Sequence, residues 1–110
     1  MSETPGPLGY GKVLYKKLNF NSLGDNVAIS GEAGKIIKVF QIVFVVAGNV
    51  NIVFKDGATA LTGAMAMLKN GSITLDYNGL NWFSASLDED FIINLSGGVR
   101  CSGGIYYTIT

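Results

Sequence analysis

The chain has 110 residues, of which 48% are hydrophobic and 15% are charged. This length predicts one domain, and so much apolar surface with so little charge excludes a disordered chain. Eight basic residues balance eight acidic ones, which argues against nucleic-acid binding and leaves little charge repulsion to oppose self-association.

The first eleven residues, Met1 to Gly11, differ from the rest of the chain. They contain both prolines, three glycines and no apolar period, a pattern typical of a flexible N-terminal arm or a disordered tail. The folded domain is expected over residues 12–110. No basic and apolar leader is present, and the longest apolar stretch, Val39 to Ala47, is too short to span a bilayer. We therefore expect no membrane partner and no export by a standard signal.

The run from Lys35 to Ala47 predicts a strand that is apolar on both faces. Regular alternation places two sets on opposite faces: Ile37, Val39, Val43 and Val45 on one, and Ile36, Phe40, Ile42, Phe44 and Val46 on the other. In a small sandwich only one face packs against a second sheet. The other face is covered either by the protein's own loops or by another subunit, and both alternatives stay open.

Shorter runs of alternating apolar and polar residues follow, each predicting a strand with one buried face. The clearest of them are Val50–Phe54, Ile73–Tyr77, Phe91–Leu95 and Ile105–Ile109. Residues 58–69 mix helical spacing with threonine and glycine, which weaken a helix, so strand and loop are predicted there. Eight or nine short strands without an amphipathic helix predict an all-β fold, an antiparallel β-sandwich of the jelly-roll kind.

The residue types that catalysis needs are scarce. The chain has no histidine and one cysteine, Cys101, which lies in a strand-like stretch without a partner base. We therefore expect a structural thiol and no enzymatic activity. The acidic run Asp88-Glu89-Asp90 matches no calcium loop and predicts a solvated turn, so no metal or cofactor is expected. In the pair Trp82-Phe83, alternation places one ring in the core and one outside.

Seven stretches of the chain form a recognisable order of strands and turns. They are Gly34–Val39, Ala47–Gly57, Thr59–Met65, Asn70-Gly71, Trp82-Phe83, Asp90–Ser96 and the C-terminal strand. This order resembles that of small jelly-roll proteins of tailed bacteriophage virions, which occur as head decoration (cement) proteins and as modules of fibres or spikes. The likeness covers about three-quarters of the chain and rests on turn and strand patterning.

The resemblance implies a virion structural protein, made in the host cytoplasm and placed on the capsid surface. It would be a homotrimer that binds the major capsid protein and stabilises the assembled head. The arm would lie across a neighbouring capsid subunit, so a deletion of Met1 to Tyr10 is expected to fold but not to attach. The candidate contact residues are Tyr10, Val39, Phe40, Val43, Phe44, Trp82 and Phe83.

One alternative to decoration stays open. A carbohydrate- or receptor-binding jelly-roll module of a phage fibre or spike would share the fold. It would use exposed Trp82, Tyr77 or Tyr106 as platforms on which a sugar ring stacks.

Overall fold

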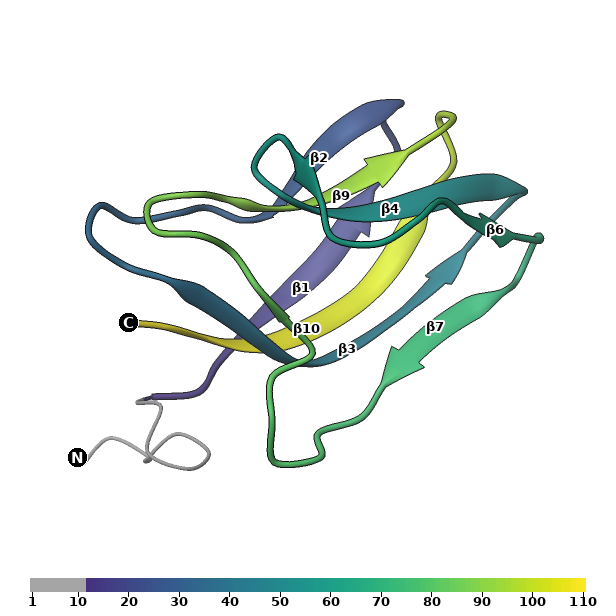
Figure 1. The fold of residues 1–110 in the computed structure, drawn as a ribbon. Coiled ribbons are helices and arrows are strands. Elements are labelled where there is room, and N and C mark those ends of the chain that lie inside the picture. Colours follow the sequence, from purple (N-terminus) through teal and green to yellow (C-terminus); the bar gives the residue numbers. More distant parts are fainter. Residues whose placement is uncertain (1–11) are drawn as a thin grey trace.

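The computed structural model describes residues 12–110, which form ten strands in two antiparallel sheets and no helix (Figure 1). The predicted all-β sandwich is therefore confirmed. The count exceeds the eight or nine expected because three of the ten strands are only two or three residues long. The predicted N-terminal arm, with Tyr10, lies outside the described residues.

The two sheets share a jelly-roll order. Sheet A has the order β1-β10-β3-β7, with β8 also pairing with β3, and sheet B has the order β2-β9-β4-β5, with β6 also pairing with β4. The strands of sheet A are β1 (Leu14–Phe20), β3 (Ile37–Val46), β7 (Ser72–Leu75), β8 (Phe83–Ser84) and β10 (Cys101–Ile109). Those of sheet B are β2 (Gly24–Ile29), β4 (Val50–Asp56), β5 (Thr59–Ala60), β6 (Met65–Met67) and β9 (Phe91–Leu95). The first four strands alternate between the sheets, and β9 and β10 return between them, as in a jelly roll.

The core lies between the sheets and is centred on aromatic rings. The Phe54 ring lies 6.1 Å from that of Phe44, 5.8 Å from that of Phe91 and 5.0 Å from that of Phe83, measured between centroids. These rings come from both sheets, and Phe44, Phe54 and Phe91 are buried. Their burial removes a large apolar area from water, the main favourable contribution to folding.

Strand β3 departs from regular alternation at Phe40. Tyr106 of β10 pairs with Gln41, but the next residue, Tyr107, pairs with Val39. Phe40 is thus an extra residue, a β-bulge, and the side chains after it change faces. For this reason, the two faces that regular alternation predicted for the run from Lys35 to Ala47 were wrong. The inward set consists of five buried residues: Ile37, Val39, Ile42, Phe44 and Val46.

The edges of both sheets are poorly suited to pairing with another chain. Strand β1, the edge of sheet A, carries Lys16 and Lys17, and both are exposed. Strand β2, the edge of sheet B, has an irregular register between Val27 and Ile29. The strands on the opposite side of the sandwich, β5 to β8, are only two to four residues long. Charges, irregularities and short strands are the features by which natural edges resist sheet extension, so contacts with other chains are more favourable through a sheet face.

Candidate functional site

Part of the outer face of sheet A is an open surface with one charged residue, built from three rows across the strands. The strand registers place eleven residues in these rows: Tyr15, Tyr106 and Gln41; then Lys17, Gly104, Val43 and Thr74; then Asn19, Ser102, Val45 and Ser72. We call this set the tyrosine–valine face. Lys17 is its only charged residue. Four large side chains on it are exposed: Tyr15 (57%), Val43 (43%), Val45 (45%) and Tyr106 (43%).

The two tyrosines of this face lie against each other above a glycine. Their ring centroids are 4.9 Å apart, with 53° between the ring planes. A Cβ on Gly104 would lie only 2.6 Å from Cε1 and 2.7 Å from Cζ of Tyr15, so the Tyr15 ring covers the backbone of Gly104. The ring therefore rests against the sheet on one side and is open to solvent on the other.

The tyrosine–valine face is poor in charge and contains two exposed tyrosines. The central parts of protein interfaces are likewise depleted of charged residues and enriched in tyrosine. The serine, threonine and amide side chains in its rows can form hydrogen bonds at a lower desolvation cost than a charged group. Among the described residues, this set combines four exposed large side chains with a single charged residue.

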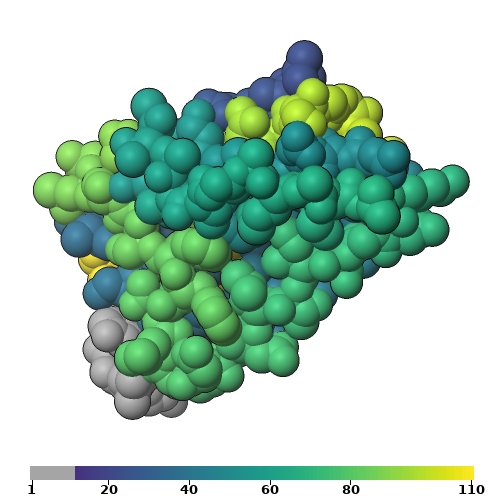
Figure 2. Space-filling view, turned by 45° about the vertical axis from the view of Figure 1, so that its right-hand side comes forward, coloured from purple at the N-terminus to yellow at the C-terminus, as the bar shows by residue number. Residues whose placement is uncertain are grey.

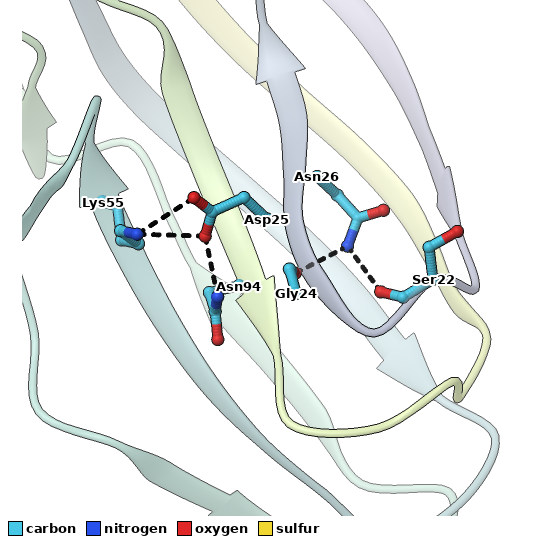
Figure 3. A network of polar contacts seen from close by, with 6 residues as sticks. All are labelled: Ser22, Gly24, Asp25, Asn26, Lys55 and Asn94. Atoms are coloured by element: carbon cyan, nitrogen blue, oxygen red, sulfur yellow. Dashed lines mark hydrogen bonds and ion pairs between the residues drawn. The ribbon is translucent and has the colours of Figure 1, made fainter.

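The outer face of sheet B differs, because its charged groups are paired within the face (Figure 3). The Lys55 Nζ atom lies 3.0 Å from both carboxylate oxygens of Asp25, and the Asn94 side-chain amide donates to Asp25 Oδ1 at 2.7 Å. The hydrogen bond from Asn94, followed by that from Lys55, holds the pKa of the Asp25 carboxyl below its usual value. This network satisfies its own charges and needs no partner.

A second apolar surface lies on the loop from residue 76 to residue 82, between β7 and β8. We call it the aromatic loop, and Figure 2 shows this stretch, in green, at the lower part of that view of the molecule. Its exposed large hydrophobic side chains are Tyr77 (47%), Leu80 (61%) and Trp82 (40%). Trp82 is anchored at both ends, since its indole Nε1–H donates to the Asp76 carbonyl at 2.8 Å and its backbone N–H to the Val39 carbonyl at 2.7 Å.

The predicted contact residues are divided between surface and core. Val43 lies on the tyrosine–valine face and Trp82 on the aromatic loop, and both are exposed. Three others are buried in the described chain and form no part of its surface: Val39, Phe40 and Phe44. The reason is the bulge, which places Val39 and Phe44 on the same inward face, whereas Phe40 packs near the ring of Tyr77, at 6.3 Å between centroids.

Phe83 is partly buried and stacks on Phe91, with 6.0 Å between centroids and 27° between ring planes. The predicted division of the Trp82-Phe83 pair into one outer and one inner ring is therefore confirmed. Tyr15 and Val45 were not among the predicted contacts. Local alternation assigns Tyr15 to one face of β1 and Val45 to one face of β3. Only the pairing of both strands with β10 shows that these faces form one surface.

The acidic run after β8 has a structural role in a neighbouring loop. Asp90 Oδ1 accepts a hydrogen bond from the backbone N–H of Gly31 at 2.6 Å, and Asp88 Oδ1 accepts one from that of Gly34. Both carboxylates thus hold the connection between β2 and β3. Within residues 12–110, no group of three or more His, Cys, Asp or Glu side chains is placed to hold a metal ion.

Cys101 is buried, as expected of a structural thiol, and its burial raises the pKa of the thiol. A raised pKa disfavours the thiolate, which is the nucleophilic form. Cys101 therefore belongs to the packing of the core and not to a reactive site.

No protein-family model, curated protein or solved structure matches this chain. In the part of the chain that the structure describes, no helix is long and apolar enough to cross a membrane. The two exposed apolar surfaces, the tyrosine–valine face and the aromatic loop, are the candidate contact sites of the described residues.

Proposed function

We propose that this chain is a structural protein of a tailed-bacteriophage virion, a decoration protein that binds the assembled head and stabilises it. The observation that carries the proposal is the aromatic loop, whose exposed Tyr77, Leu80 and Trp82 give the chain an apolar surface in addition to the tyrosine–valine face. Such a chain is suited to assembly with other proteins. The phage context rests on the sequence resemblance to small jelly-roll virion proteins.

The mechanism is stabilisation through binding. A protein that binds the assembled shell, but not the separated subunits, lowers the free energy of the shell by an amount set by its concentration and affinity. At a concentration of one hundred times the dissociation constant, each site contributes about 2.7 kcal/mol. Because a shell repeats the same site many times, weak contacts add up to a large effect.

The aromatic loop is the surface that we assign to the head. Exposed tryptophan and tyrosine side chains are the most frequent anchors of protein interfaces, and this loop carries Tyr77, Leu80 and Trp82 together. The tyrosine–valine face then remains available for a further protein. Two apolar surfaces on one chain allow it to bind the shell and a neighbour at once.

The test is attachment to heads assembled without this chain. We expect the purified chain to sediment with such heads and to raise the temperature at which they break open. Leu80→Ser, in the aromatic loop, should weaken attachment. Leu23→Ser changes an equally accessible leucine between β1 and β2 (71% exposed, against 61% for Leu80) and should not. Failure of the unaltered chain to sediment with heads would refute the proposal.

A second candidate function is glycan binding by a fibre or spike module. The observation that favours it is the exposure of Tyr77 and Trp82 in one loop, since aromatic rings stack on the apolar faces of sugars. Trp82 is the only tryptophan in the chain, so its fluorescence reports directly on this loop. A saturable fluorescence change on titration with soluble oligosaccharides, abolished in Tyr77→Ala, would favour glycan binding over head decoration.

A further inference from the structure

We propose that the tyrosine–valine face binds the same face of a second copy of the chain, about a twofold axis that runs parallel to the strands between β10 and β3. This inference goes beyond the proposed function, because it concerns the chain in solution and holds whether or not the chain attaches to a head.

The shape of the face supports this axis. A twofold axis along the strands places β10 of one copy over β3 of the other, row by row. Val45 then lies over Ser102, so that a branched side chain meets a small one, and Val43 lies over Gly104. Because the Tyr15 ring covers Gly104, Val43 of the second copy contacts the outer side of that ring, an aromatic–aliphatic contact of the kind that stabilises sheets. Each contact occurs twice.

The charges of the face support the same axis. It places β1 over β7, so that Lys17 lies over Thr74, which is followed two residues later by exposed Asp76. Asp76 directly follows the end of β7 and continues the outward alternation of Ser72 and Thr74. A lysine side chain is long enough to reach a carboxylate one row away. The only charge on the tyrosine–valine face thus finds an opposite charge in the second copy.

A twofold axis perpendicular to the strands, the other arrangement that keeps the strands of the two copies aligned, is disfavoured by the charges of the face. Centred on the middle row, it would place Lys17 over Lys17 and Val43 over Val43. Like charges would then meet and repel each other. The pattern of the face therefore selects the axis along the strands.

The size of the face sets the expected strength of the dimer. Sheets that pack face to face lie about 10 Å apart and cross at roughly 30°, so the row pairs hold best at the centre, near Val43 and Gly104. Eleven residues form the face, against about 20–30 on each side of a stable interface. We therefore expect a reversible dimer whose population rises with protein concentration. The net charge of zero leaves no overall repulsion between copies.

The first test is sedimentation equilibrium of the full chain over a wide concentration range, with a matched pair of variants. Val43→Lys introduces a charge at the centre of the tyrosine–valine face, and Val27→Lys introduces one on the outer face of sheet B. The two valines are equally exposed, Val43 at 43% and Val27 at 42%. Each also has a lysine two strands away in its own row, which is Lys17 for Val43 and Lys55 for Val27. We expect Val43→Lys to raise the dissociation constant about tenfold or more, and Val27→Lys to leave it unchanged.

The second test exchanges charges to identify the axis. Lys17→Asp and Asp76→Lys should each weaken the dimer, and the double variant should restore it. Within one copy these two positions lie at opposite edges of sheet A, about 14 Å apart at the normal strand spacing, so restoration has to come from contacts between copies.

Several results would overturn the inference. These are a monomer at every concentration up to about 1 mM, a stable trimer as the family resemblance implies, equal effects of the two valine variants, or no restoration in the double variant. None of them bears on head attachment, which the sedimentation assay with heads measures separately.

Discussion

The ring of Tyr15 lies over Gly104 of the neighbouring strand, in the space where any other residue would carry its side chain. The preceding residue in that strand, Gly103, lies against the backbone of β3 instead of against a ring. A Cβ on Gly103 would lie 2.6 Å from the Cα and 2.7 Å from the Cβ of Phe44 and would overlap the Val43 carbonyl oxygen. One glycine is thus covered by a movable ring and the other by backbone.

This difference predicts unequal effects of two neighbouring substitutions. Gly104→Ala should cost less than about 1 kcal/mol of unfolding free energy, because the exposed Tyr15 ring turns aside, although the turned ring should weaken self-association. Gly103→Ala should cost about 2–3 kcal/mol, because the backbone of β3 has to shift. Urea unfolding measures both, with Gly63→Ala as a control, since Gly63 has no atom within 4 Å of its Cβ position. Equal losses for the first two variants would contradict the packing described.

The contact between Asp90 and Gly31 predicts the role of the acidic run. Asp90→Ala removes the acceptor of the Gly31 N–H at 2.6 Å and should lower the unfolding free energy by about 1.5–3 kcal/mol, as for other hydrogen bonds to charged groups. Glu89→Ala leaves this bond in place and should cost clearly less. Calcium should not change the thermal midpoint of the unaltered chain. A rise of several degrees on adding calcium would instead support a metal site at this run.

The Asp25 network predicts a pH dependence of stability. Because the pKa of Asp25 is lower in the folded chain, its contribution is full above the pKa of an unfolded aspartate, about 4, and is lost as pH falls through the folded-state pKa. Asp25→Asn should therefore lower the unfolding free energy at pH 7, and the difference from the unaltered chain should shrink as the pH falls through the folded-state pKa of Asp25. The side chain is largely exposed, so the effect is at most about 1 kcal/mol.

The control for this prediction separates the two hydrogen-bond donors. Since the bond from Asn94 is the larger cause of the lowered pKa, Asn94→Ala should reduce the pH dependence more than Lys55→Met does. Unfolding free energies from urea titrations at several pH values give the comparison. A difference between Asp25→Asn and the unaltered chain that persists undiminished at pH 2 would show that Asp25 acts through packing and not through its charge.

The hydroxyl of Thr108 predicts a stabilising substitution. Among the described residues, Thr108 Oγ1 is a buried side-chain oxygen without a hydrogen-bond partner. Thr108→Val removes this unsatisfied group with little change of shape and should raise the unfolding free energy by about 1 kcal/mol. Thr62 offers the opposite case, because its hydroxyl accepts from the Phe54 N–H at 3.2 Å, and Thr62→Val should be destabilising by a similar amount. A loss of stability in Thr108→Val would mean that the hydroxyl has a partner.

The sequence alone determined where most strands and turns lie. The alternation of Val50, Ile52 and Phe54 predicted an inward face, and all three residues are buried in β4. Asn70 precedes Gly71 in a dipeptide typical of tight turns, and it has a φ of 68°. Residues 58–69 were assigned to strand and loop, and they contain β5 and β6. These features depend on neighbours one or two residues apart, which the sequence displays directly.

Only the tertiary structure decided which side chains share a surface. The bulge at Phe40 placed Ile37 and Val39 on the same inward face as the residues from Ile42 onward, because the register of β3 depends on how it pairs with β10. Tyr15, Gly104 and Val43 come from three distant parts of the chain and meet because β1, β10 and β3 are neighbours in sheet A. Alternation specifies two faces for each strand, but strand order and register determine which faces combine into the surface that a partner meets.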